Sequence, residues 1–137
     1  MLKKTLTYTD YNGTERTEDF YFNISKSELI DMEMSEEGGL RERLDRIIKE
    51  KDAKKLYQYF KELVSFAYGI KSDDGKRFIK SPELTAAFVQ TEAYSDFFTD
   101  LATNDVHAAE FVNGIMPKLP ATEPGVGSNA VKFPSAN

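Results

Sequence analysis

The chain contains no cysteine and no tryptophan, and His107 is its one histidine. Without cysteine it cannot form disulfides, zinc–thiolate sites or a cysteine nucleophile, and a single imidazole excludes metal sites that need two. No apolar run approaches the roughly 20 residues that span a bilayer. The N-terminal MLKKTLTYTD has no apolar segment of the kind that a secretory signal requires. We therefore expect a cytosolic protein that does not enter a membrane.

Motifs for catalysis or phosphate binding are also missing. The glycines form neither G-x-G-x-x-G nor G-x-x-x-x-G-K, and no G-x-S-x-G could expose a nucleophilic serine. Asp73 and Asp74 precede Gly75 as in a calcium loop, but the twelfth position counted from Asp73 is Leu84 instead of a glutamate. Carboxylates far apart in sequence could still meet in the fold. The sequence predicts no catalytic, cofactor-binding or metal-binding residue, and hence a protein that is not an enzyme.

Basic residues are absent from one third of the chain. The net charge is −5, yet residues 1–80 hold 16 Lys/Arg against 16 Asp/Glu. Residues 81–117 hold no Lys or Arg and carry six acidic residues: Glu83, Glu92, Asp96, Asp100, Asp105 and Glu110. Such a segment repels a phosphate backbone, so we expect no nucleic-acid partner. It is either a solvated acidic surface or a face that steers a basic partner.

A β-hairpin is predicted at the N-terminus, where Asn12-Gly13 separates two strand-like runs. A two-residue loop would place Phe20 on the face opposite Leu6. We therefore prefer a bulge-type loop that includes Thr14, holds Gly13 in a left-handed conformation and pairs Leu6 with Phe20. In that arrangement Leu2, Leu6, Tyr8, Phe20, Phe22 and Ile24 share one face, while Thr5, Thr7, Thr9, Thr17 and Asp19 face water. The apolar face must lie on helices, since two strands alone are marginal in water.

The rest of the chain up to Pro117 predicts helices. The expected N-caps are Ser25 (in a capping box with Glu28), Asp52, Ser81 before Pro82, Thr91, and either Asn104 or Asp105. Gly38-Gly39 and Gly69 are expected to end helices, and residues 76–80 could add a third strand. We predict an α+β, mostly helical fold with the hairpin packed on five or six helices. Residues 1–117 form one domain, and residues 118–137, rich in Pro, Gly, Ser, Ala and Asn, predict a disordered tail.

The helix expected over residues 53–69 has a wide apolar arc. Its main stripe is Ala53, Leu56, Tyr57, Phe60, Leu63, Val64 and Ala67, with Tyr59 and Phe66 together on one flank. The arc exceeds what one-sided packing needs, so this helix is either central or also meets another chain. Our candidates for partner contact are Tyr59, Phe66, Tyr94, Phe98 and Phe111. They are either core residues or an apolar patch with an acidic rim.

Three stretches carry a family resemblance: LKKTLTYTDYNGTERTEDFYFNISKSELIDME, FKELVSFAYGIKSDDGKRFIKSPEL and QTEAYSDFFTDLATNDVHAAEFVNGIMP. Together they resemble tail assembly chaperones of long-tailed, siphovirus-type phages and prophages of Gram-positive bacteria. The resemblance implies a non-enzymatic protein that binds the tape-measure protein and keeps it soluble until tail-tube subunits polymerise around it. It also implies self-association, contact with the major tail protein by a longer form, and absence from the finished virion.

Two other functions are compatible with the composition. The chain could be a structural tail or head–tail connector subunit, which purified virions would contain. It could instead be a small acidic inhibitor of a host protein, which would bind that protein in a salt-sensitive manner without any tail protein present.

Overall fold

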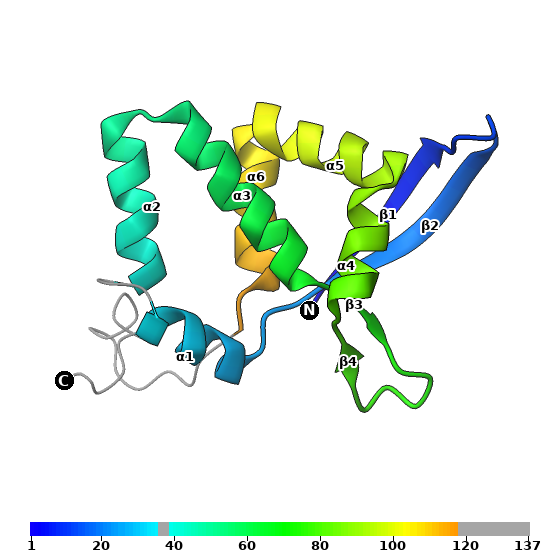
Figure 1. Ribbon diagram of the computed structural model, residues 1–137, viewed down its shortest axis with the longest axis horizontal. Coiled ribbons are helices and arrows are strands. Elements are labelled where there is room, and N and C mark those ends of the chain that lie inside the picture. The colour runs from blue at the N-terminus through cyan, green and yellow to red at the C-terminus, as the bar shows by residue number, and fades with distance from the viewer. Residues whose placement is uncertain (36–38, 118–137) are drawn as a thin grey trace.

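A computed structural model describes the backbone of residues 1–35 and 39–117, and the side chains of these residues except 39–41. The expected tail over 118–137 lies outside the described residues. The elements are β1 (Leu2–Thr9), β2 (Glu15–Phe22), α1 (Lys26–Ser35), α2 (Gly39–Glu50), α3 (Ala53–Ala67), β3 (Tyr68–Lys71), β4 (Phe78–Ile79), α4 (Pro82–Val89), α5 (Glu92–Thr103) and α6 (Asp105–Ile115). The fold is α+β and mostly helical, as predicted (Figure 1).

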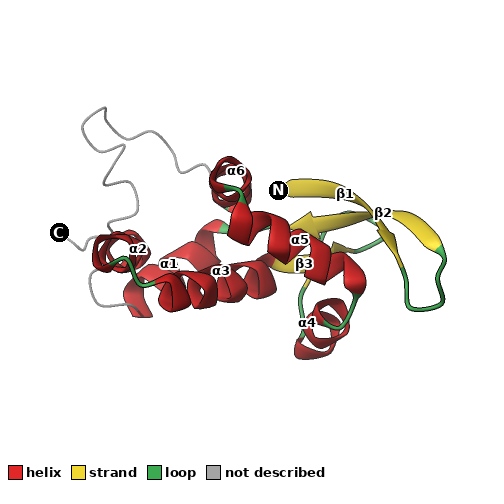
Figure 2. Ribbon diagram, turned by 90° about the horizontal axis from the view of Figure 1, so that it is seen from above, coloured by secondary structure: helices red, strands yellow, loops and turns green. Residues whose placement is uncertain are grey.

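The four strands form an antiparallel sheet in the order β1-β2-β3-β4. Helices α5 and α6 pack against β1, and α4 lies beside β3. Figures 1 and 2 show the hairpin at one end of the molecule and α2 at the other, with α3 and α5 between them. Exposure along β1 alternates residue by residue, so one face of the hairpin meets the helices and the threonine face is open to water.

The hairpin loop holds Gly13 at φ 82°, which confirms the left-handed conformation, but the register differs from the prediction. Leu6 pairs with Glu18 instead of Phe20. The reason is Asp10, whose carboxylate accepts hydrogen bonds from the backbone N–H groups of Asn12 and Thr14, both at 2.9 Å, and so starts the turn one residue early. The shift amounts to two residues, so every side chain keeps its predicted face.

Strand β3 differs from the prediction, since Tyr68 and Gly69 are expected at the end of the helix over 53–69 and no strand is expected at Ile70 and Lys71. Helix α3 ends at Ala67 and the chain enters β3 at once, so Gly69 is a strand residue instead of a helix terminator. A Cβ at Gly69 would lie 2.7 Å from Cε2 of Phe78 and 2.8 Å from the Ile79 carbonyl oxygen, so glycine is needed for close strand packing. The expected third strand over 76–80 is β4, which pairs with β3 and not with the hairpin.

The helix starts agree with the sequence signals. Ser25 and Glu28 form the capping box reciprocally, through Ser25 N–H to Glu28 Oε1 at 2.8 Å and Glu28 N–H to Ser25 Oγ at 3.1 Å. The other N-caps are Asp52, Ser81, Thr91 and, of the two alternatives at the last helix, Asn104. Gly39, expected to end a helix, is instead the first residue of α2.

The core centres on Phe22, which is fully buried near the end of β2. Its ring lies 5.3 Å from that of Phe97 on α5, 5.5 Å from that of Phe111 on α6 and 5.8 Å from that of Phe88 on α4, measured between centroids. Aromatic pairs at such distances stabilise beyond the area they bury. One strand residue therefore joins three consecutive helices that begin 60 positions later in the sequence.

Candidate functional site

The five aromatic candidates divide by exposure. Tyr59, Tyr94 and Phe111 are buried, with 3%, 8% and 2% of their surface exposed. Phe98 is half-buried and stacks on Tyr94, with ring centroids 5.8 Å apart. Phe66 is exposed at 38%. Among the five, therefore, Phe66 has the most exposed ring, and the others build or support the core.

Helix α3 is central, and its buried face differs from the predicted stripe. Tyr59, Leu63, Val64 and Ala67 are buried, whereas Tyr57, placed on the main stripe, is 49% exposed. The helix is thus rotated toward the Tyr59 flank. The reason is that three helices, α2, α4 and α5, pack against α3. That rotation brings Tyr59 and Phe66 to the wall of one groove.

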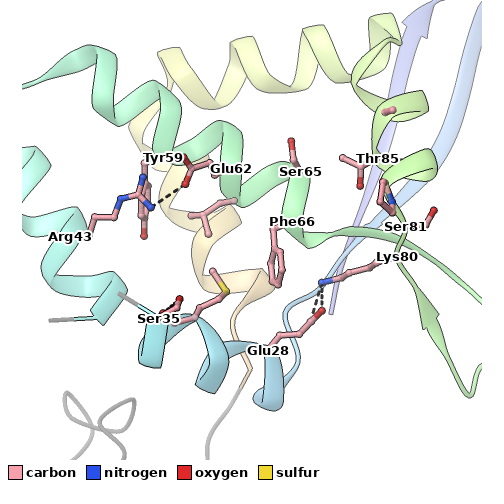
Figure 3. Close-up of a pocket in the computed structure, with 14 residues that line it drawn as sticks. Glu28, Ser35, Arg43, Tyr59, Glu62, Ser65, Phe66, Lys80, Ser81 and Thr85 are labelled. Atoms are coloured by element: carbon pink, nitrogen blue, oxygen red, sulfur yellow. Dashed lines mark hydrogen bonds and ion pairs between the residues drawn. The ribbon is translucent and has the colours of Figure 1, made fainter. Parts of the chain in front are cut away.

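The groove has a volume of about 860 Å³ and lies between α1, α3 and α4, with α2 at one end (Figure 3). Its walls are mostly apolar or small side chains. They are Met32 and Ser35 of α1, Tyr59, Leu63, Ser65 and Phe66 of α3, and Ser81, Pro82, Thr85 and Ala86 at the start of α4, together with Glu28, Arg43, Glu62 and Lys80. Concave, largely apolar sites of this size are where proteins take ligands or peptide segments.

Lys80 crosses one end of the groove between α1 and α3 (Figure 3). Its Nζ lies 3.0 Å from both carboxylate oxygens of Glu28 and 4.4 Å from the centroid of the Phe66 ring. Desolvation by burial lowers the pKa of Lys80, while the hydrogen bond and charge of Glu28 act in the opposite direction. The ammonium is thus paired with a carboxylate and lies over an aromatic face, two contacts that stabilise a cation.

Arg43 and Glu62 form a second ion pair at the α2 end. Arg43 Nη1 lies 3.0 Å from Glu62 Oε1, and the guanidinium carbon lies 5.3 Å from the centroid of Tyr59. Both ion pairs bridge different elements, one joining α1 to Lys80, between β4 and the N-cap of α4, and the other joining α2 to α3. The groove is therefore electrically balanced, with two carboxylates matched by two cations.

The charged side chains that line the groove form ion pairs with one another. Within residues 1–35 and 39–117 no group of three or more His, Asp or Glu is placed to hold a metal ion. His107 Nδ1 pairs with Asp100 at 2.8 Å on the surface, where both side chains are about half exposed. No helix in the described part of the chain is long and apolar enough to cross a membrane.

Sequence reasoning missed the polar half of the groove. Glu28 was recognised as a helix-capping residue, and its second contact, with Lys80 52 positions later, left no local signal. Arg43 and Glu62 are not singled out by the sequence, because their contact joins two different helices. The one usable signal was the flank formed by Tyr59 and Phe66, which the structure confirms as a shared wall.

The acidic third of the chain lies on α4, α5 and α6. Glu83, Asp96, Asp105 and Glu110 are exposed, and Glu92 accepts a hydrogen bond from the Tyr11 hydroxyl of the hairpin loop at 3.0 Å. The carboxylates thus face water, and steering of a basic partner by this face stays a prediction.

Comparison with known proteins gives one match. A family model described as a phage tail assembly chaperone matches residues 1–121, nearly the whole chain. No curated protein and no solved structure matches.

Proposed function

Since this chain belongs to the phage tail assembly chaperone family, we propose that it binds the tape-measure protein through the α1–α3–α4 groove and keeps that protein soluble. The tape-measure protein remains bound until tail-tube proteins polymerise around it. The chaperone acts in the cytoplasm of the bacterial host, without catalysis or cofactor, and is left out of the virion. Self-association and a contact with the major tail protein belong to the same proposal.

The observation that carries this proposal is the exposed face of Phe66 inside an open, apolar groove. A protein that must shield apolar helical segments needs a concave surface to receive them and no chemistry to alter them. Both ion pairs of the groove are already satisfied within the chain, so an incoming segment does not have to supply charges. Apolar side chains on one face of a client helix are therefore the expected ligand.

Weak contacts are sufficient for this role. A long client can engage many copies of a small chaperone, and linked contacts gain affinity without any single strong site. Copies bound side by side along the client would cover its apolar surface, which is the part that otherwise aggregates.

The test is co-expression with the tape-measure protein of the same phage, comparing Phe66→Ala with Tyr57→Ala. Both rings are exposed on α3, at 38% and 49%, but Tyr57 lies outside the groove. We expect Phe66→Ala to lower the soluble, co-purifying fraction of the tape-measure protein several-fold, as truncation of a central anchor does. Tyr57→Ala should leave that fraction unchanged.

Equal effects of the two variants would contradict a groove-specific contact. A tape-measure protein that stays insoluble beside the folded wild-type chain would contradict the chaperone function itself. In that case the presence of the chain in purified virions would favour a structural tail subunit.

A further inference from the structure

Strand β1 forms a border of the sheet and has eight residues, twice as many as β3 (Figure 2). Asp10 N–H donates to the Thr14 carbonyl at 2.8 Å, so Asp10 and Thr14 form a hydrogen-bonded pair of the β1–β2 ladder. Since such pairs alternate, the even-numbered residues of β1 bond to β2. The odd-numbered residues therefore direct their backbone N–H and C=O groups away from the sheet. These residues are Lys3, Thr5, Thr7 and Thr9, and all four are exposed.

In the described part of the chain no hydrogen bond reaches the outward backbone groups of these four residues. An edge of this length is usually interrupted by proline, a bulge or an inward charge, because it otherwise pairs with another strand. Proline and bulge are both absent from β1, and its charges, Lys3 and Lys4, sit at one end. The edge is thus available for pairing over most of its length.

We propose that β1 pairs antiparallel with β1 of a second copy of this chain, in a register centred on Leu6. A two-fold axis at Leu6 places Thr5 opposite Thr7 of the second copy and Lys3 opposite Thr9. Odd residues then meet odd residues, as the outward backbone groups require. Like charges directly opposite one another would be destabilising, and this register contains no such pair between the two β1 strands.

The charges along the hairpin favour β1 of a second copy over an unrelated strand. The start of β1 is basic through Lys3 and Lys4, whereas the loop end carries Glu15, the cross-strand partner of Thr9 on the open face. Antiparallel pairing sets Lys3 of each copy beside Thr9 of the other, with Glu15 one strand further. The Lys3 and Glu15 backbones are then about 10 Å apart, a span that the two extended side chains can close. Symmetry makes this contact twice.

The opposite face of the same pairing is compatible with it. Leu6 meets Leu6 at the axis, and Lys4 lies opposite Tyr8, whose hydroxyl donates to Glu18 at 2.6 Å. Arg16, the cross-strand partner of Tyr8, is already paired with Asp10 at 2.6 Å and with Glu18 at 3.4 Å. The aromatic ring and the carboxylate provide a favourable setting for the Lys4 ammonium. The result is a continuous eight-stranded sheet made from two four-stranded ones.

The oligomeric state of the full chain, measured by light scattering up to high micromolar concentration, tests this inference. Thr7→Pro removes an outward N–H without touching the β1–β2 bonds. Its control is Thr17→Pro, because Thr17 is the cross-strand partner of Thr7 and β3 pairs only with Tyr21 and Phe22 of β2. We expect wild type and Thr17→Pro to associate through this contact and Thr7→Pro to lose it.

A charge exchange keeps the test decisive if the proline variants fail to fold. Lys3→Glu alone and Glu15→Lys alone should each weaken association roughly fivefold, and the double variant should restore it. A monomeric wild type, an unchanged Thr7→Pro variant, or a double variant without recovery would each overturn the inference. The inference rests on the self-association included in the proposed function and gives it an interface. Because this edge lies outside the groove, Thr7→Pro should still bind the tape-measure protein, so failure of the β1 pairing and failure of client binding are distinguishable.

Discussion

At the residue scale, Lys80 combines an ion pair, a cation–π contact and a place next to a helix cap. It pairs with Glu28, lies over Phe66 and directly precedes the N-cap of α4. Glu28 in turn serves two partners, since it also accepts from Ser25 N–H in the capping box. Two half-buried side chains thus connect α1, α3 and α4 across one end of the groove.

A double-mutant cycle measures that connection. Lys80→Met removes the cation and leaves Glu28 without its partner, while Glu28→Gln keeps an oxygen for the cap and removes the charge. We expect each single variant to lower the free energy of unfolding by about 1 kcal/mol, since both side chains keep some solvent. The double variant should lose less than the sum of the two, because the second change no longer breaks a pair.

Chemical denaturation of the four proteins gives the coupling. An additive double variant would show that the contact is formed without stabilising the fold. The Phe66 ring should remain exposed in either case, so client binding can be compared in the same set of proteins.

At the element scale, the junction between α3 and β3 has no loop. Tyr68 follows Ala67 directly, and Asn23 N–H donates to the Ala67 carbonyl at 2.8 Å, so the end of the helix is already joined to the end of β2. Gly69, the second residue of β3, allows β4 to approach closely on the other side, where a Cβ would meet Phe78 and Ile79.

Gly69→Ala should therefore be destabilising by about 2 kcal/mol, because the new methyl would meet the Ile79 carbonyl oxygen as well as the Phe78 ring. Gly114→Ala on α6 is the matched control. There a Cβ would lie 3.0 Å from Leu2 Cδ1, a flexible side-chain end, and the helix gains propensity from alanine. We expect Gly114→Ala to stay within about 1 kcal/mol of wild type by thermal or urea unfolding. Equal losses would contradict the assignment of Gly69 as a packing residue.

The same junction shows where sequence reasoning stops. Helix starts were predictable because a capping side chain acts within three residues, as Ser25, Asp52, Ser81, Thr91 and Asn104 do. The faces of the hairpin followed from alternation. Strand β3 could not be predicted in this way, since Tyr68–Lys71 is short and follows a helix without a break. Its pairing depends on β2, nearly 50 positions earlier, and the polar side of the groove is likewise made of pairs far apart in sequence.

At the scale of the whole molecule, charge and apolar surface are separated. The exposed carboxylates of Glu83, Asp96, Asp105 and Glu110 lie on α4, α5 and α6, and the groove between α1, α3 and α4 is balanced by its own ion pairs. The affinity for a partner should therefore depend on salt concentration differently at the acidic helices and at the groove.

Binding of the tape-measure protein at the groove should change by less than about threefold over a tenfold range of salt concentration, because satisfied ion pairs contribute little net attraction. Titration calorimetry with a soluble helical fragment of the client gives this dependence. A steep loss of affinity with salt would instead locate the contact on the acidic helices and favour a basic partner.

The groove is built from residues between Glu28 and Ala86, yet it depends on chain that is synthesised later. Helix α5 supports α3 from behind, and the Ile115 carbonyl at the end of α6 accepts from Ile24 N–H just before α1. A ribosome must therefore release about thirty residues beyond the last groove residue before the walls can assemble. A partly translated copy that ends before α6 lacks both supports, so we expect the proposed binding of the tape-measure protein only from chains that extend past α6.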